Sequence, residues 1–349
     1  MPIEKISIAR DPKWYLAWPD VVLTDSGRLV CVFSECTHHG NRSHTRILLS
    51  DSTDRGATWT PRRPLTEATD NLGYYYNCAR ISKLSDGRLC VAVDRIPIEG
   101  ETRHTNESVV YLYFSADDGQ SWSAPVETPV RGIVPDKLLE LANGRWLLAA
   151  HAQGEDGFLV QYLRYSDDRG ATWSDRVTVA RQNGLNLCEV SLIPVGGSDI
   201  VALMRENSFK GYDCKKTISH DNGETWGPVI DFPLPGCHRP VAGHLADGRA
   251  LVTYRFLQGG VSSFGSWTQN FFAALTDDDS LLSDVRERSW TRIMPVDFDR
   301  SPHSDLGYSG WAQFPDGEIY VVNYIVDDAI DKGQIRGYRF RPEDFLLPG

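Results

Sequence analysis

The sequence has no run of about 18 apolar residues, the length that an α-helix needs to cross a bilayer. It also has no basic stripe: the net charge is −11, and acidic and basic residues are mixed along the chain, which argues against nucleic acid as a partner. The N-terminal residues MPIEKISIARD contain no apolar signal-peptide core, and the seven cysteines form no CxxC pair. These absences predict a cytoplasmic protein without membrane or nucleic-acid partners.

Helical periodicity is nearly absent as well, and in its place the chain repeats one phrase four times. The copies are STDRGATW from Ser52, SADDGQSW from Ser115, SDDRGATW from Ser166 and SHDNGETW from Ser219. The Asp carboxylate can accept hydrogen bonds from N–H groups of its own turn, the Gly permits a left-handed backbone, and the Trp can pack between strands. We therefore predict that the phrase is a structural turn and not a ligand site.

A second repeat is a tight glycine turn followed by an apolar run. Its six glycines are Gly27, Gly87, Gly144, Gly196, Gly248 and Gly317. Asp-Gly or Asn-Gly between apolar runs is typical of a β-hairpin. Each of the first four turns is followed by one Trp phrase, so one unit contains four strands. Six such units predict an all-β protein, a six-bladed β-propeller of four-stranded antiparallel blades, and residues 1–349 are expected to form a single domain.

The last two units depart from this pattern. The fifth keeps only a degenerate phrase between Thr276 and Trp290, and the sixth has none. We expect the N-terminal segment EKISIAR to supply the outermost strand of the sixth blade and so to close the ring.

Propeller geometry indicates where a ligand would bind. The glycine turns lie on one face, so the first-strand starts and second-strand ends surround a funnel on the other face. Seven residues before the first four glycines stand Asp20, Arg80, Lys137 and Glu189, and the corresponding slots of the last two blades hold His238, Arg239, Asp305 and Tyr308. The second strands end in Glu35, Asp94, Arg95, His151, Arg205, Glu206, Tyr254, Arg255, Asn323 and Tyr324. Such a ring predicts a pocket for a polar ligand, with buried salt bridges between blades as the alternative.

The four phrases resemble the Asp-boxes of the sialidase superfamily, and the likeness covers essentially the whole chain. NLCEVSLIPVGGSDIVALMREN resembles the sialidase fourth blade, which implies catalytic and substrate-binding roles for Glu189 and Arg205. DLGYSGWAQFPDGEIYVVNY resembles the sixth blade, which implies that Tyr308 is the nucleophile. A phenol, with a pKa of about 10, attacks well at neutral pH only when a carboxylate takes its proton. We therefore predict a hydrogen bond between Tyr308 and Glu189.

The chain also departs from the sialidase pattern. Ala17 precedes Trp18 where sialidases have their first carboxylate-binding arginine, and residues 259–275 contain no third arginine. The usual acidic proton donor is absent before the first Asp-box, so we expect the donor to be His44, His39 or Asp20. The other expected substrate contacts are Trp18, Arg80, Arg95, Lys137, His151, His238, Arg239 and Arg255. The histidine spacing fits no zinc site, and no metal or other cofactor is expected.

The sequence thus favours an exo-acting glycoside hydrolase that removes a terminal acidic or deoxy sugar from an oligosaccharide or glycoconjugate. One alternative is a uronate-specific oligosaccharide lyase on the same scaffold, with a Tyr or His removing the proton beside the uronate carboxylate. The other is a non-catalytic sugar-binding propeller, although binding alone would not require both Glu189 and Tyr308.

Overall fold

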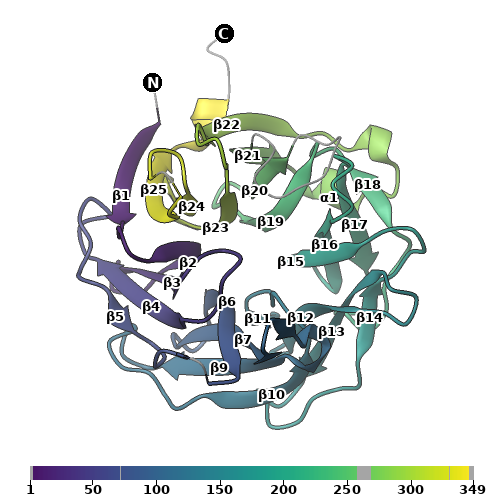
Figure 1. Cartoon of the computed structure of the whole chain (residues 1–349). Coiled ribbons are helices and arrows are strands. Elements are labelled where there is room, and N and C mark those ends of the chain that lie inside the picture. Colours follow the sequence, from purple (N-terminus) through teal and green to yellow (C-terminus); the bar gives the residue numbers. More distant parts are fainter. Residues whose placement is uncertain (1–2, 71, 258–268, 330, 346–349) are drawn as a thin grey trace.

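The computed structural model describes residues 3–70, 72–257, 269–329 and 331–345, which form six antiparallel sheets arranged as the blades of a ring (Figure 1). The first strands of neighbouring blades contact one another around the centre of this ring. The predicted six-bladed β-propeller is confirmed.

The strands follow the order expected from the repeats. The first blade contains β2 (Tyr15–Leu23), β3 (Leu29–Cys36), β4 (Thr45–Ser52) and β5 (Arg63–Pro64). The second contains β6 (Tyr74–Lys83), β7 (Leu89–Glu99), β9 (Val109–Ser115) and β10 (Val126–Arg131), with the short β8 (Thr102–Arg103) paired to β7. The third contains β11 (Leu139–Glu140), β12 (Trp146–Gln153), β13 (Leu159–Ser166) and β14 (Val177–Ala180).

The second half of the ring repeats the arrangement. The fourth blade contains β15 (Leu187–Gly196), β16 (Asp199–Glu206), β17 (Cys214–Ser219) and β18 (Ile230–Phe232). The fifth contains β19 (Cys237–His244), β20 (Ala250–Leu257), β21 (Gln269–Thr276) and β22 (Arg292–Phe298). The sixth contains β23 (Leu306–Gln313), β24 (Ile319–Ile325), β25 (Gln334–Phe340) and β1 (Glu4–Ala9).

The N-terminal strand closes the ring as predicted. β1 pairs antiparallel with β25, with Lys5 opposite Tyr338 and Ile6 opposite Gly337. The two ends of the chain therefore share one blade, which joins the last blade to the start of the first.

Helices are short in this structure. Among the described residues they are α1 (Asp278–Leu282) and three 3-10 turns, η1 (Thr105–Glu107), η2 (Arg286–Arg288) and η3 (Pro342–Phe345). α1 lies inside the degenerate fifth phrase, where Trp290 Nε1 still donates to Asp277 Oδ2 at 2.7 Å. In the described ranges, no helix combines the length and the apolar character that a bilayer crossing requires.

The core consists of apolar layers between adjacent blades, because both faces of each sheet are covered. Val30 and Val32 of the first blade, for example, belong to one buried cluster with Ile81 and Val91 of the second. This double burial explains why the second strands read as nearly continuous apolar runs.

The four Trp phrases form the same turn each time. The Ser Oγ accepts from the Gly N–H at 2.7–2.9 Å, and the Asp Oδ1 accepts from the Thr or Ser N–H at 2.8–2.9 Å. The turns contact the glycine turns of neighbouring blades: Arg55 pairs with Asp316 at 2.9 Å, and Glu224 pairs with Arg145 at 2.8 Å. The phrases therefore lie on the face opposite the funnel, as predicted.

Candidate active site

A two-residue bulge interrupts the innermost segment of every blade at its funnel end. At this point two residues of the first strand lie opposite one residue of the second, so the register slips by one residue. In the third blade the equivalent step lies between the Ile133–His151 bridge and Asp136. The first bulge residues are Trp18, Asn77, Val134, Glu189, Arg239 and Tyr308. We call these six positions the bulge layer.

The backbone of the bulge layer is strained. Five of its six residues have positive φ values, namely Trp18 (53°), Val134 (49°), Glu189 (53°), Arg239 (50°) and Tyr308 (56°). For a residue other than glycine, this conformation costs about 1–3 kcal/mol and persists where the surrounding structure enforces it, often at active sites. The repeated strain therefore marks this layer as the candidate site.

The sequence predicts a funnel position seven residues before each of the first four turn glycines. This position belongs to the bulge layer only in the fourth blade, where the turn is tighter. In the first two blades this position holds Asp20 and Arg80, which lie below the layer. Asp20 Oδ2 accepts from the Ile81 N–H at 2.9 Å and lies 3.3 Å from Arg80 Nε, while Arg80 Nη1 donates to the Ser309 carbonyl at 2.8 Å. Asp20 and Arg80 thus join neighbouring blades, and their roles as proton donor and substrate contact stay predictions.

In the described ranges, two further candidates form no hydrogen bond or ion pair with Tyr308 or Glu189. The Arg95 guanidinium lies over the rings of Tyr74 and Tyr111, 4.7 and 4.4 Å from their centroids, and also hydrogen-bonds the Tyr111 hydroxyl. Lys137 is half-buried in the third blade, and in the described ranges no hydrogen bond or ion pair joins it to Tyr308 or Glu189. The roles of Arg95 and Lys137 as substrate contacts stay predictions.

Tyr308, Glu189 and Arg205 form the centre of the funnel. The Tyr308 hydroxyl donates to Glu189 Oε1, and Arg205 Nη1 donates to the same oxygen at 2.7 Å. All three side chains are buried, with the exposed fraction of Tyr308 at 9%. The predicted Tyr308–Glu189 hydrogen bond is confirmed, while the catalytic roles of the two residues stay a prediction.

The electrostatics keep this pair as a neutral phenol beside a carboxylate. Burial and the Glu189 charge raise the pKa of Tyr308 well above its usual value, outweighing Arg205 and Arg255. Burial alone would raise the pKa of Glu189, but the charges of Arg205 and Arg255 and the Tyr308 hydrogen bond lower it overall. Proton transfer from Tyr308 to Glu189 is therefore unfavourable in the structure as it stands.

Two more arginines flank the Tyr308 ring, but their N–H groups bind the protein itself. The guanidinium carbons of Arg239 and Arg255 lie 5.5 and 5.7 Å from the ring centroid. Arg239 donates to the carbonyls of Pro135 and Val190, at 3.1 Å each, both of which are second bulge residues. Arg255 donates to the Leu306 carbonyl at 3.1 Å. Both arginines thus stabilise the bulges and add positive charge around the phenol.

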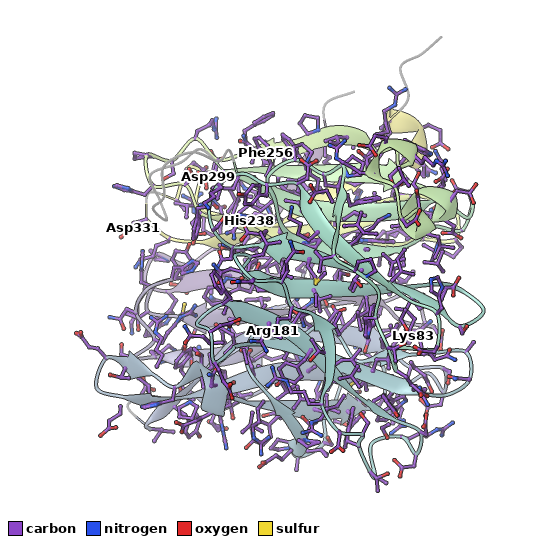
Figure 2. All side chains as sticks on the ribbon, turned by 90° about the vertical axis from the view of Figure 1, so that its right-hand side faces the viewer. Lys83, Arg181, His238, Phe256, Asp299 and Asp331 are labelled. Carbon is purple, nitrogen blue, oxygen red and sulfur yellow. The ribbon has the colours of Figure 1, made fainter. Side chains whose placement is uncertain are left out.

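Two histidines at the centre are held in the neutral form. Burial lowers the pKa of His151 to about 4, and burial with the charges of Arg205 and Arg255 lowers that of His238 well below its usual value. The Glu189 N–H donates to His151 Nδ1 at 3.4 Å. In the side view of Figure 2, His238 and Asp299 lie toward one side of the ring and Lys83 toward the other.

No metal site is found among these groups. Within the ranges that the structure describes, no three His, Cys, Asp or Glu side chains are grouped as ligands of one ion would be.

A second carboxylate, Asp305, organises the junction of the sixth and first blades. It accepts hydrogen bonds from the hydroxyls of Tyr15 and Tyr324 and contacts His39 Nδ1. Burial raises the pKa of Asp305, but the charges of His39 and Arg255 and these hydrogen bonds lower it to about 2. Asp305 is therefore ionised at neutral pH and fixes the His39 ring, whose centroid lies 5.3 Å from that of Trp18.

The predicted proton donor His44 lies in a different network. Its Nδ1 is 2.8 Å from Asp70 Oδ1, its Nε2 is 3.2 Å from Glu35 Oε1, and its ring stacks on Trp14 with centroids 4.0 Å apart. Both ring nitrogens of His44 thus lie against carboxylates of the first blade, and its role as proton donor stays a prediction.

Sequence reasoning missed two residues beside the site. Asp299 accepts four backbone N–H bonds, two of them from Asp305 and Asp327, and so fixes the loop that carries Asp305. Arg42 places its guanidinium carbon 3.9 Å from the Trp18 ring centroid. Both lie in segments without strand periodicity, so no sequence signal pointed to them. Most of the range 259–275, where a third arginine was absent, lies outside the described residues.

Comparison with known families and proteins agrees with this architecture. Residues 95–321 match the model of the BNR repeat-like domain. A sialidase of Bacteroides fragilis is 27% identical over 214 residues, which cover 55% of this chain and 36% of that protein. A sialidase of Paraclostridium sordellii is 24% identical over 200 residues, covering 51% and 47%. The chain thus spans less than half the length of these two relatives.

Solved structures share the fold at low sequence identity. A Dyadobacter fermentans protein of unknown function superimposes with a TM-score of 0.77 at 21% identity, and 98% of each chain is covered. A Hadza microbial sialidase has a TM-score of 0.71 at 17% identity, covering 95% of this chain and 66% of that one. An intramolecular trans-sialidase of Ruminococcus gnavus has a TM-score of 0.67 at 13% identity, covering 96% of both.

Proposed function

Because this chain belongs to the BNR repeat-like domain family, as a divergent member of the sialidase superfamily, we propose that it is an exo-acting glycoside hydrolase. Its substrate would be an oligosaccharide or glycoconjugate with a terminal acidic or deoxy sugar. The observation that supports this most strongly is the single oxygen, Glu189 Oε1, that accepts from both the Tyr308 hydroxyl and Arg205. A non-catalytic sugar-binding protein would not require a phenol paired with a buried carboxylate.

In the proposed first step, Tyr308 Oη forms a bond to the anomeric carbon and transfers its proton to Glu189. The glycosidic carbon–oxygen bond breaks, and the leaving oxygen takes a proton from a general acid. Water then adds to the anomeric carbon and gives a proton to the deprotonated general acid, which is thereby restored. The bond to Tyr308 breaks, and the phenol recovers its proton from Glu189. A neutral phenol suits an acidic sugar, because it approaches without repulsion between like charges.

Buried atoms without hydrogen-bond partners support substrate binding at this centre. Within the described ranges, Nε and Nη2 of Arg205 and Oε2 of Glu189 are buried and have no partner. A buried polar atom left unpaired costs about 1–3 kcal/mol, so a ligand that pairs with these atoms regains that energy. Arg205 is suited to a carboxylate or a pair of hydroxyls, because its planar fork donates two parallel hydrogen bonds.

His39 is the proton donor that we favour among the three sequence candidates. Asp305 holds its Nδ1, so proton transfer to the leaving oxygen would pass through Nε2. The aromatic side chains of Trp18, Tyr324 and Tyr308 extend from His39 toward the nucleophile: Trp18 and Tyr324 centroids are 6.0 Å apart, and Tyr324 and Tyr308 centroids 6.5 Å. Asp20 and His44 are each committed to other partners.

The test is a screen of the purified protein against glycans and aryl glycosides with terminal sialic, uronic, deoxy and neutral sugars. Released sugar is measured by chromatography, and unsaturated product by near-ultraviolet absorbance, with Tyr308→Phe as the control. Hydrolysis that the control loses supports the proposal. An unsaturated product would instead identify a lyase, and binding without turnover would identify a sugar-binding propeller.

A further inference from the structure

A cavity of about 820 Å³ opens at the rim between the first and second blades, apart from the Tyr308 centre. We call it the rim cavity. Its lining includes Arg42, Leu72, Tyr74, Ile98, Glu101 and Arg103. Three segments therefore build it, one after β3, one leading into β6 and one around β8, and it contains two arginines and one carboxylate.

Arg42 is the buried cation of the rim cavity. Its side chain stacks on Trp18, with the guanidinium carbon 3.9 Å from that ring centroid and 5.8 Å from the centroid of Tyr75. The residue is 7% exposed, and in the described ranges its Nε and Nη1 have no hydrogen-bond partner and no carboxylate forms an ion pair with it. A buried charge without a counter-charge is costly, whereas a guanidinium held flat on a Trp ring is preorganised for a planar anion.

Arg103 adds a second positive charge to the same cavity. Its guanidinium carbon lies 5.7 Å from the Tyr75 centroid, so one tyrosine is shared by both arginines. Its Nη2 donates to the Gly40 carbonyl at 2.6 Å, which fixes the loop that carries Arg42. Glu101 is exposed and forms no ion pair with either arginine in the described part of the chain, so the cavity keeps a net positive charge.

Arg42 links the rim cavity to the bulge layer, because its guanidinium lies against the ring of Trp18. The Trp18 ring lies 6.0 Å from Tyr324, which in turn lies 6.5 Å from Tyr308 between centroids. A glycan bound with its terminal sugar at Tyr308 could extend across Trp18 into this cavity.

We propose that the rim cavity is a second anion-binding subsite, in which Arg42 and Arg103 bind the carboxylate of a sugar adjacent to the one that is cleaved. This inference rests on the proposed function for the position of that sugar, but not for the binding itself. The substrates it predicts are glycans with two neighbouring acidic sugars, of which the inner one carries its carboxylate toward the first two blades.

The test is calorimetric binding of sodium glucuronate, with glucose and sodium sulfate as comparison ligands, to the whole chain and its variants. We expect glucuronate to bind better than glucose, and Arg42→Met to weaken glucuronate binding by about tenfold or more. Arg176→Met is the matched control, because Arg176 also lies flat on a ring, 3.8 Å from the Tyr162 centroid, but is far from the cavity in the third blade. Its affinity should match the unmodified protein.

Several outcomes would overturn the subsite. One is equal affinity of the unmodified protein and Arg42→Met for glucuronate, and another is equal affinity of the protein for glucose and glucuronate. The third is loss of glucuronate binding in Arg205→Met but not in Arg42→Met, which would place the anion at the centre. Sulfate binding as tight as glucuronate would show a general anion site and contradict recognition of a sugar. If Arg42→Met does not fold, Arg103→Gln serves instead, with an expected loss of about threefold. Binding that depends on Arg42 without any turnover would retain the subsite and reject the hydrolase.

Discussion

The Trp turns and the bulge layer are both repeated structures, and they differ in what is repeated. In the Trp turns, the backbone geometry, hydrogen bonds and residue types recur together in four blades. At the funnel, the bulge recurs in all six blades, but its side chains are Trp18, Asn77, Val134, Glu189, Arg239 and Tyr308, all different.

This difference follows from what each region requires. The hydrogen bonds of a Trp turn form within its own blade, because its Ser and Asp accept from N–H groups of the same turn. Every copy of the turn therefore needs the same residues. The six bulges converge on one centre, where a second copy of a nucleophile or base would add nothing. A repeated backbone with unrepeated side chains therefore indicates chemistry, whereas a repeated sequence indicates scaffold.

The sharpest test of this contrast is Tyr308→Phe, which removes one hydroxyl from the bulge layer. We expect turnover to fall by about a thousandfold or more, because the nucleophile is lost. The melting temperature should change by only about 2 °C, since Arg205 still pairs with Glu189. Steady-state kinetics and thermal unfolding measure the two effects.

Glu189→Gln should behave similarly, and the double variant should be no slower than either single variant, because the two groups act as a unit. Additive losses would mean that Tyr308 and Glu189 act separately. Near-normal turnover of Tyr308→Phe would remove the mechanism altogether.

Arg205→Lys and Arg145→Lys compare an arginine of the funnel with an arginine beside the Trp turns. Lysine keeps the charge but loses the planar fork, so kcat/KM should fall by about a hundredfold while the melting temperature changes little. Arg145→Lys is the matched control, because Arg145 forms ion pairs with Asp167 and Glu224 of the Trp turns. It should leave kcat/KM unchanged. A joint collapse of stability and activity in Arg205→Lys would make Arg205 a structural partner of Glu189.

His39→Ala and His44→Ala distinguish the two histidines of one loop. With a poor leaving group, His39→Ala should lose about 10²-fold in kcat, because the general acid is absent. With an aryl leaving group that departs without a proton, its activity should recover. His44→Ala should show no such selective recovery, since His44 binds Glu35 and Asp70. Recovery in His44→Ala alone would reverse the assignment.

Most of the fold could be predicted from the sequence, because turns and strand periodicity are local. The six glycine turns and four Trp phrases gave the number of blades, and the absence of a phrase in the last unit pointed to β1 as the closing strand. The Tyr308–Glu189 contact was also predicted, since both residues begin first strands and face one axis.

The rest of the site depended on features that spacing does not reveal. In the first two blades, the funnel positions are the bulge residues Trp18 and Asn77, and Asp20 and Arg80 lie two and three residues beyond them. In the fourth blade the glycine turn is tighter, so the same spacing identified Glu189 correctly. Arg42 and His39 belong to a loop, whose path is set by contacts with Trp18 and Asp305. Such tertiary contacts have no period in the sequence.

The pH dependence of stability offers a smaller test within the funnel. The pKa of Asp305 is lowered to about 2, below that of an unfolded Asp, so its ionised form stabilises the fold above about pH 4. This contribution, about 2 kcal/mol, should be lost as the pH falls from about 4 to 2. Denaturant unfolding of the unmodified protein and Asp305→Asn at pH 7, 4 and 3 measures it. The gap between the two should narrow in acid, and a constant gap would contradict the ionised pairing of Asp305.

We expect the smallest effect from Asp221→Ala, a change in the fourth Trp turn. This change removes three hydrogen bonds, of 2.8 Å from the Thr225 N–H, 2.5 Å from the Thr225 hydroxyl and 2.8 Å from the buried Ser219 hydroxyl. Thr225 is exposed, so water replaces its lost acceptor, and the Ser219 hydroxyl accounts for most of the cost. We therefore expect a decrease of about 1–3 °C in the melting temperature. kcat and KM should be unchanged, because the turn lies on the face opposite Tyr308. A change in kcat without a change in melting temperature would show that a repeated sequence can carry chemistry, and would break the distinction between the Trp turns and the bulge layer.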